Sequence, residues 1–422
     1  MRPLIIVGYA GVLLAALTEI QPAGSVIFVE EPDVVRKRGL RELVPGLALT
    51  RELVEWEYGL PGAADEFHRA HPGLEPAAVV PVVEYATPFA ARLAELYGLP
   101  GAGLVAAEIL RDKRLLRRVT AAAGIANPAS VPVTSPAGVL AFLRERSGPV
   151  VLKPANRQAS VGTQVIHDAG EVEEAWAACV EQDEGVFVSD RPMPLSMLAE
   201  QYVDGREYSV ELLVRDGQAL FANVTDKFLF PGPRPVERAH RVPAEIPANL
   251  AATLGRHTMV VLGAIGFRTG IVHCEWIVPD DGVPHLVECA GRLPGGGILD
   301  IIQLAYGVEL LRAYLTVLRG EDPGVLPRRA VRGAAVRFLT AGPGVVEGIH
   351  GADAARRAPG IVLVHIGATA GEEYGRVRSS WDRAGVVMST GDSAADALER
   401  AEKAARAIRI DVDQKQVVGG RT

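Results

Sequence analysis

The sequence predicts a mixed α/β and α+β protein that begins with a Rossmann-like parallel layer and continues into several further subdomains. Three observations predict this class. The chain opens with a strand, a helix and a second strand; alternating strands and helices follow from about residue 130; and 422 residues exceed what one ordinary hydrophobic core serves. The composition, 48% hydrophobic and 23% charged, is that of a globular protein.

The parallel layer is predicted from three short apolar runs, at residues 4–8, 25–29 and 79–83. A helical stretch to Ile20 separates the first two runs, as in a βαβ unit. Gly8 to Gly11 lack the GxGxxG spacing, so this layer is expected to be a scaffold rather than a dinucleotide site. Glu84 follows the third run, at the sheet edge where open α/β sheets bind ligands.

The remaining elements follow from periodicity and from breaker residues. Residues 86–123 are predicted to be helical with a break at 99–101, and residues 124–128 end that helix. A strand at 334–339 and a last helix at 394–408 predict a small terminal subdomain.

Charge and cysteine content exclude several kinds of function. A net charge of -7 offers no basic surface for a phosphate backbone, so nucleic acid is not an expected partner. Three cysteines without a CxxC pair indicate neither a disulfide framework nor a zinc site. The apolar stretch at residues 3–20 is better explained by a strand and a helix than by a signal peptide, so the expected compartment is the cytoplasm, with no membrane partner.

Lysine is scarce in this chain, since only six of the 44 basic residues are lysines. Arginine's planar fork cannot replace a compact ammonium at every site, so a lysine inside a strand or helix invites a reason. Two further segments join such lysines as candidates for nucleotide contact. The loop at residues 155–162 joins two strands and has small residues whose N–H groups can cover phosphates, although an ordinary hairpin turn is as good an explanation.

The second segment is the strand at residues 198–203. Because side chains alternate along a strand, the backbone groups of Gln201 and Val203 point along one edge, where an adenine ring could receive a donor and an acceptor. Glu207 on the next strand would then lie near a ribose hydroxyl. A solvent-facing hairpin with ordinary glutamates is the alternative.

The strongest argument comes from two strands that flank Asp281-Gly282, a dipeptide preferred in two-residue hairpin turns. A hairpin centred there places Glu275 opposite Glu288, with Cβ atoms roughly 4.5–5.5 Å apart. Facing carboxylates repel unless a cation lies between them, and hard oxygen ligands suit Mg²⁺ with bridging phosphates. The same register puts His273 and Arg292 on the metal side.

In the alternative, both glutamates face solvent and the opposite face is the buried one, formed by Cys274, Trp276, Val287 and Cys289. After the hairpin, Arg292 and a glycine-rich turn lead into a helix. A guanidinium at such a helix N-terminus can hold a carboxylate or a developing oxyanion, or the glycines serve the turn alone.

Taken together, these segments resemble the ATP-grasp superfamily over roughly residues 1–410. The resemblance implies that Lys113, Lys153 and Lys227 contact nucleotide phosphates, and that Glu275 and Glu288 bind Mg²⁺, with Mn²⁺ as a substitute. It further implies an adenine hinge at Glu200, Gln201 and Val203, a ribose-binding acid at Glu207 and a phosphate loop that contains Ser160, Val161 and Gly162. Ala290 departs from the family, where asparagine is common two residues after the second metal acid.

The run at residues 287–292 is similar to the L-amino-acid ligase branch, which includes bacilysin-type dipeptide synthetases. That similarity implies that Arg292 faces an acyl phosphate, with Lys227 and Ser160 as further catalytic residues. It implies a substrate site formed by Glu84, His240, Arg292, Gly295 and Gly296. The glycine at 296 would leave room for a bulky second substrate.

The resemblance also implies the domain division and the activity. The expected domains are a pre-ATP-grasp domain at 1–112, a lid at 113–198, a hinge and metal subdomain at 199–322 and a C-terminal subdomain at 323–422. The expected reaction uses ATP to activate a carboxylate as an acyl phosphate and joins it to an amine, both small molecules and expected to be amino acids; a homodimer is compatible with it. Biotin-type or purine-type carboxylase chemistry and a non-catalytic nucleotide-binding module are the alternatives.

Overall fold

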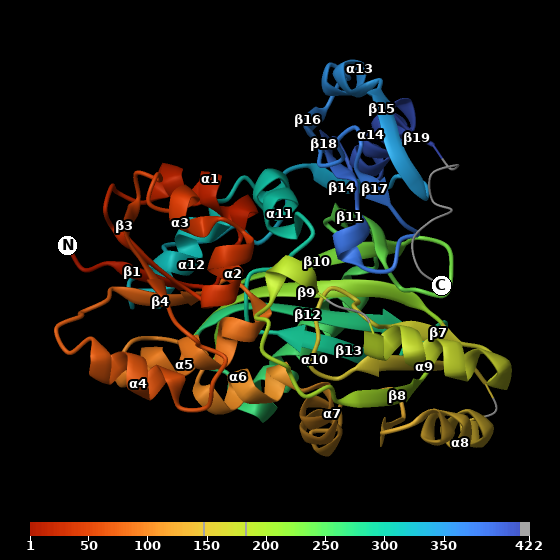
Figure 1. Ribbon diagram of the computed structural model, residues 1–422, viewed down its shortest axis with the longest axis horizontal. Helices are drawn as coiled ribbons and strands as arrows, with labels where there is room; N and C mark the ends of the chain where they lie inside the picture. Colours follow the sequence, from red (N-terminus) through yellow and green to blue (C-terminus); the bar gives the residue numbers. More distant parts are fainter. Residues whose placement is uncertain (147, 182–183, 414–422) are drawn as a thin grey trace.

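The computed structural model describes residues 1–146, 148–181 and 184–413. It contains two four-stranded sheets, an eight-stranded sheet and a three-stranded sheet. Figure 1 shows the N-terminal domain beside the long strands of the eight-stranded sheet, with the C-terminal elements above them. The predicted fold class is confirmed, because parallel and antiparallel sheets occur in separate parts of the chain.

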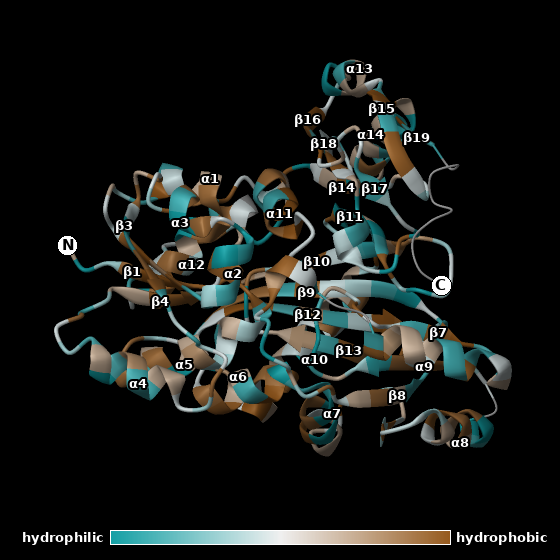
Figure 2. Ribbon diagram, viewed as in Figure 1, coloured by the Kyte–Doolittle hydropathy of each residue, from teal (hydrophilic) through white to brown (hydrophobic). Residues whose placement is uncertain are grey.

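The N-terminal sheet is parallel throughout, in the order β3-β2-β1-β4. β1 and β2 are fully buried and apolar but for Glu30, as strands covered on both faces by helices must be (Figure 2). Residues at the carboxyl ends of three of these strands line the central cleft: Tyr9 after β1, Glu30 at the end of β2, and Val82 and Val83 after β4. The elements of this domain are β1 Leu4–Val7, α1 Gly11–Ile20, β2 Val26–Glu30, α2 Pro32–Lys37, α3 Leu40–Leu43, β3 Thr50–Glu55, α4 Ala63–Ala70, β4 Ala78–Pro81, η1 Glu84–Ala86 and α5 Thr87–Leu96.

Two helices lead from this domain to the lid, α6 Leu104–Arg111 and α7 Lys113–Ala122. The predicted break at 99–101 lies between α5 and α6. A second break, at Asp112, was not predicted: the Asp112 side chain accepts a hydrogen bond from the Arg114 N–H and caps α7. Lys113 is therefore the first residue of α7, where its N–H donates to the Ala155 carbonyl at 3.0 Å.

The lid contains a four-stranded sheet in the order β5-β8-β6-β7, with α8 and α9 packed on one face over Val139, Phe142 and Val172. The predicted strands at 150–154 and 163–167 correspond to β6 and β7. The lid elements are β5 Ser130–Val133, α8 Pro136–Arg146, β6 Val150–Pro154, β7 Gln164–Ile166, η2 Ala169–Glu171, α9 Val172–Glu181, η3 Gly185–Phe187 and β8 Met197–Gln201.

The eight-stranded sheet, in the order β13-β12-β9-β10-β11-β14-β18-β16, joins the centre of the chain to its C-terminal part. α10 covers one face through Leu254, Val261 and Leu262, and the opposite face carries the site. Because β14 pairs with β11, the sheet continues across residue 323, where a domain boundary is predicted. The elements are β9 Arg206–Arg215, β10 Gln218–Leu229, β11 Glu237–Val242, α10 Ala248–Ile265, β12 Gly270–Val278, β13 His285–Ala290, α11 Ile298–Tyr306, α12 Leu310–Leu318, β14 Gly333–Leu339, β16 Ile361–Ile366, β18 Gly385–Gly391 and α14 Ala394–Ala407.

The remaining small sheet pairs β15 with β17 and β19 near the C-terminal end. Its elements are β15 Gly344–His350, α13 Ala352–Arg356, β17 Glu373–Tyr374, η4 Ser380–Asp382 and β19 Arg409–Asp413. Residues 414–422 of the predicted C-terminal subdomain lie outside the described residues. Within the described chain no single helix is long and apolar enough to span a membrane; α11 and α12 pass that test only as a pair bent by 106°.

Candidate active site

Glu275 and Glu288 lie opposite each other on β12 and β13, as predicted. The predicted two-residue turn is wrong, because residues 279–284 form a longer connection in which the Gly282 N–H donates to the Pro279 carbonyl at 2.9 Å. A bulge between Glu275 and Trp276 then shifts the pairing by one residue and restores the predicted register at the glutamates.

The two faces of this hairpin have different environments. Trp276, Cys274 and Cys289 are buried under α10, and the Trp276 ring N–H donates to the Thr258 hydroxyl at 3.1 Å. Both glutamates face a cleft rather than an open sheet surface, so the solvent-exposed alternative is not what the structure has. Val287, which that alternative buries, is half-buried on the cleft wall.

Alternation along β9 and β10 gives the same sheet face a polar floor. Ser209 lies opposite Glu275 and Thr225, and Glu211 lies opposite His273 and Asn223. Glu211 is fully buried and accepts hydrogen bonds from the hydroxyls of Ser209 and Thr225 and from the Asn223 amide at 2.6–2.7 Å. This network was missed from the sequence, although the polar residues at alternate positions 207, 209 and 211, and again at 223, 225 and 227, were a usable signal.

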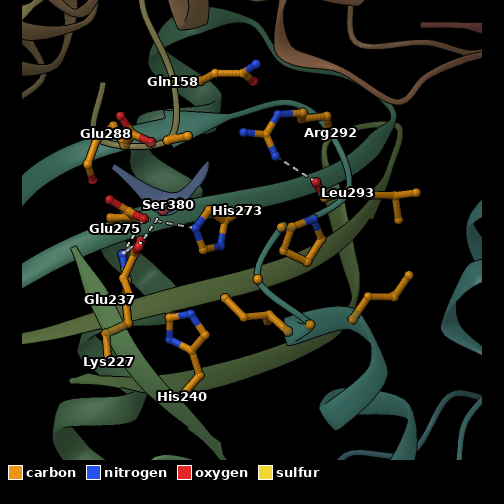
Figure 3. A pocket seen from close by; sticks show the side chains of 18 of the residues that line it. Gln158, Lys227, Glu237, His240, His273, Glu275, Glu288, Arg292, Leu293 and Ser380 are labelled. Atoms are coloured by element: carbon orange, nitrogen blue, oxygen red, sulfur yellow. Dashed lines mark hydrogen bonds and ion pairs between the residues drawn. The ribbon is translucent and has the colours of Figure 1, made fainter. Parts of the chain in front are cut away.

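His273 joins the buried network to Glu275. Its Nδ1 lies 2.9 Å from Glu211 and its Nε2 3.1 Å from Glu275. Burial alone would lower the pKa of His273, but the hydrogen bonds to the two carboxylates raise it to about 9. A protonated imidazole therefore orients the Glu275 carboxylate toward the cleft (Figure 3).

Lys227 is the most deeply buried cation of the site. Its ammonium lies 2.5 Å from Glu207. It also lies 3.4 Å from Glu237 and closer still to Glu275, as Figure 3 shows. Burial alone would lower the pKa of Lys227, yet the three carboxylates raise it well above its ordinary value. Lys227 is therefore charged and helps to neutralise all three carboxylates, of which Glu237 also pairs with Arg383 at 2.6 Å.

The other two predicted lysines also meet carboxylates in the cleft. Lys113 lies 2.9 Å from Glu288, and Lys153 lies 2.5 Å from Glu200. Although burial would raise it, the Lys113 ammonium lowers the pKa of Glu288 to about 2. Arg117, which sequence reasoning missed, shares Glu200 at 2.8 Å. The Glu200 side chain is thus held in buried ion pairs with Lys153 and Arg117. A nucleotide base at this position would therefore contact the backbone of the residues that follow Glu200 rather than its carboxylate.

Among the described residues, the backbone of the predicted adenine hinge leaves one N–H group, that of Val203, available for a ligand. The N–H groups of Gln201 and Tyr202 donate to the carbonyls of Ala129 and Pro149 at 2.8 and 3.1 Å. Val203 lies beyond the end of β8 and its N–H has no hydrogen-bond acceptor in the described part of the chain. One donor thus remains beside the Gln201 carbonyl, as an adenine edge requires.

The phosphate loop at 155–162 is a compact turn that closes on the C-terminal part of the molecule. Ala159 and Ser160 have left-handed φ angles of 57°, and the Ser160 hydroxyl donates to the Pro235 carbonyl at 3.0 Å. The Ser380 N–H donates to the Ala159 carbonyl at 3.2 Å. A Cβ at Gly162 would lie 3.0 Å from Pro154, so this position needs glycine for close packing.

These elements enclose a cleft of about 1800 Å³. Fifteen of the predicted site residues line it, namely Lys113, Lys153, Ser160, Val161, Glu200, Gln201, Val203, Glu207, Lys227, His240, Glu275, Glu288, Arg292, Gly295 and Gly296. Gly162 and Glu84 are the two that do not. Glu84 lies behind the wall, 2.6 Å from the Arg292 Nε and 3.4 Å from Arg111, and thereby orients Arg292.

The glycine turn approaches His240. Gly296 has a φ of 61°, and a Cβ there would lie 3.0 Å from the His240 Nε2. Burial lowers the pKa of His240 well below its ordinary value, so the imidazole is neutral. Glycine at position 296 therefore allows the close contact with His240, in addition to leaving space beside Arg292.

The donor set at Glu275 and Glu288 fits a hard divalent cation. No group of three His, Cys, Asp or Glu side chains in the described ranges could hold a metal alone. Two carboxylates on adjacent strands suit Mg²⁺ or Mn²⁺ when phosphate oxygens and water supply the other ligands. Ala290, opposite His273, supplies no further donor.

The fold and the cleft define a class of nucleotide-dependent enzyme, and comparisons with known proteins agree. Residues 146–300 match the ATP-grasp domain family, and residues 337–413 match the L-amino acid ligase C-terminal domain 2 family. An L-amino acid ligase from Bacillus licheniformis has the same fold, with a TM-score of 0.79 and 20% identity over 98% of this chain and 99% of that one.

Relatives in sequence include alanine–anticapsin ligase of Bacillus subtilis, 25% identical over 54% of this chain and 51% of that protein. An uncharacterised protein of Sinorhizobium fredii, y4rH, is 28% identical over 81% of this chain and 70% of its own length. Residues 146–300 therefore form an ATP-grasp domain, and the chain is similar to the L-amino acid ligases, ADP-forming enzymes that form carbon–nitrogen bonds.

Proposed function

We propose that the protein activates the carboxylate of one amino acid with ATP as an acyl phosphate and condenses it with the amine of another, giving a dipeptide, ADP and phosphate. The single observation that carries this proposal is the facing pair of Glu275 and Glu288, held between Lys113 and Lys227 in one cleft with Arg292. That arrangement supplies both signs of charge that phosphoryl transfer to a carboxylate requires.

In the first step the donor carboxylate attacks the γ-phosphate, while Lys113, Lys153 and Lys227 neutralise charge on the phosphates. Glu275 and Glu288 would hold a divalent cation, which would supply positive charge to offset that of the phosphates. In the second step the acceptor amine attacks the acyl carbon, and Arg292, oriented by Glu84, stabilises the oxyanion before phosphate leaves. The loop at 155–162 keeps water from the intermediate.

Other ATP-grasp chemistry is the second candidate. A phosphoribosylglycinamide synthetase from Anaerococcus prevotii has the same fold, with a TM-score of 0.70 and 15% identity over 98% of this chain and 100% of that one. The match of residues 337–413 to an L-amino acid ligase domain favours amino acids over a purine precursor or bicarbonate.

The test measures phosphate and ADP release over pairs of the twenty L-amino acids, with mass detection of dipeptides. Glu288→Gln is expected to lower turnover by about 10²-fold or more with every pair, because it removes half of the carboxylate pair. Glu347→Gln, at an exposed position on β15, is the matched control and should keep full activity. Near-normal turnover by folded Glu288→Gln protein would refute the proposal.

A further inference from the structure

Arg38 lies on the cleft wall, directly after α2 of the N-terminal domain. Its Nη1 donates to the Tyr9 carbonyl at 2.9 Å, and its guanidinium lies over the rings of Tyr9 and Phe187, 4.5 and 5.1 Å from their centroids. Two aromatic faces and one carbonyl therefore hold this cation in a fixed place at the cleft.

Arg38 differs in its charge balance from five other arginines of the wall. Each of the five forms an ion pair with a carboxylate; they are Arg206, Arg238, Arg292, Arg312 and Arg383. Arg38 forms none within residues 1–146, 148–181 and 184–413. Burial lowers the pKa of its guanidinium, with the Glu30 carboxyl acting in the opposite direction.

Glu30 does not supply the missing counter-charge. Its carboxyl is 2% exposed and accepts hydrogen bonds from the Tyr58 hydroxyl at 2.9 Å and from the Glu31 N–H at 2.8 Å. Burial raises the pKa of Glu30 to about 7, so it is only partly ionised near neutrality. Arg38 therefore presents an under-neutralised positive charge to the cleft.

The position of Arg38 relative to Arg292 suits a second substrate. Val7 of β1 pairs with Pro81 of β4, so Tyr9, which anchors Arg38, and Glu84, which anchors Arg292, leave adjacent strands at the same edge. Both Arg38 and Arg292 line the same cleft.

The ligation reaction determines which substrate group needs the positive charge of Arg38. The donor carboxylate becomes the new amide, whereas the carboxylate of an amino-acid acceptor survives the reaction and stays ionised in a cleft that excludes water. We propose that Arg38 binds the α-carboxylate of the acceptor amino acid and thereby selects it over a simple amine. This inference rests on the ligase function proposed above, and it places the acceptor carboxylate on a different domain from Lys153 and Lys227, where it escapes phosphorylation.

The experiment compares each ligated acceptor with its carboxamide, first in wild-type enzyme and then in Arg38→Gln. The wild type is expected to prefer the free acid, and Arg38→Gln should raise the KM for the free acid by about 10–100-fold, the range of one charged hydrogen bond. The KM values for the carboxamide, the donor and ATP should not change. Arg38→Lys should retain part of the preference, and Arg41→Gln, an exposed arginine paired with Glu55 in the same domain, should retain all of it.

Two results would overturn the inference. Wild-type enzyme could ligate carboxamides as well as free acids, or Arg38→Gln could raise both KM values equally, as expected if Arg38 only packs against Tyr9 and Phe187. If no pair of amino acids is ligated by wild-type enzyme, the proposed function fails first, and the acceptor site fails with it.

Discussion

Gly295 and Gly296 are neighbours in the turn before α11, yet they differ in what a side chain would meet. Gly296 is left-handed, and its Cβ would press on the His240 ring. We predict that Gly296→Ala lowers the free energy of unfolding by about 1–2 kcal/mol from the backbone conformation alone, with a further loss as the buried imidazole moves. Urea unfolding monitored by circular dichroism measures this change.

Gly295→Ala is the matched control. Gly295 is exposed, its φ is outside the left-handed region and nothing lies within 4 Å of a Cβ placed there. The free energy of unfolding should stay within about 0.5 kcal/mol of wild type. Equal effects of the two substitutions would contradict the role assigned to the His240 contact.

At this scale the sequence was most informative for charged residues. The spacing around residues 281–282 predicted that Glu275 and Glu288 face each other, and the resemblance to ATP-grasp proteins implied that Lys113 and Lys227 lie near them; the structure brings these residues together in one cleft. Which carboxylate each lysine contacts could not be predicted, because Lys113 and Glu288 lie on elements far apart in the sequence, α7 and β13.

Among the connecting elements, residues 184–191 act as a strap between the lid and the N-terminal domain. Lys37 of α2 donates to the carbonyls of Gly185 and Val188 at 3.0 and 2.5 Å and pairs with Asp190 at 2.8 Å.

Further contacts of residues 184–191 join Arg36 to Asp190, Tyr85 to Glu184, and Arg191 to Glu31 and Glu57. The ring of Phe187 also stacks on Trp381 at 4.1 Å, so the strap reaches the C-terminal part.

We predict that Lys37→Met loosens this strap and lets the lid open more often. A loss of about 1 kcal/mol, as for one partly exposed ion pair, corresponds to a roughly fivefold larger population of the open lid. Hydrogen–deuterium exchange should therefore accelerate in β6 and β7 and stay unchanged in β1 and β2. Lys403→Met, at an exposed position on α14, serves as control. Unchanged exchange in the lid would mean that the strap does not hold it.

At the scale of helices and strands, the sequence predicted where the strands lie better than how they are connected. The β12–β13 pairing at the glutamates was predicted and is confirmed, whereas the turn was wrong because a bulge and a longer loop compensate for each other. The strap could not be predicted, since its contacts join residues more than 90 positions apart that carry no shared pattern.

At the scale of the whole molecule, the cleft exists because three parts of the chain meet there. Lys153 reaches it from the lid, Glu275 and Glu288 from the eight-stranded sheet, and Arg38 from the N-terminal domain. The continuation of that sheet from β11 into β14 attaches the C-terminal elements to the site, and this pairing spans residues about 100 positions apart. Periodicity shows that strands exist, but it does not state their order in a sheet.

The charge balance of the whole cleft leads to the last prediction. The lysines and the carboxylates neutralise each other, so displacing one sign alone leaves the other buried and unpaired at a cost of about 3–5 kcal/mol. The phosphates of ADP can pair with the lysines, and Mg²⁺ can bind to the glutamates. Every buried charge keeps a partner only when both ligands are bound.

We therefore expect ADP alone and Mg²⁺ alone to raise the melting temperature little, and the two together to raise it by more than the sum of the separate shifts. Ligand at 100 times its Kd stabilises the fold by ~2.7 kcal/mol, enough to detect by scanning calorimetry. Glu288→Gln should remove the excess, because its amide is a poor metal ligand and leaves Lys113 without its carboxylate. Strictly additive shifts in the wild type would show that the lysines and the glutamates bind their ligands independently.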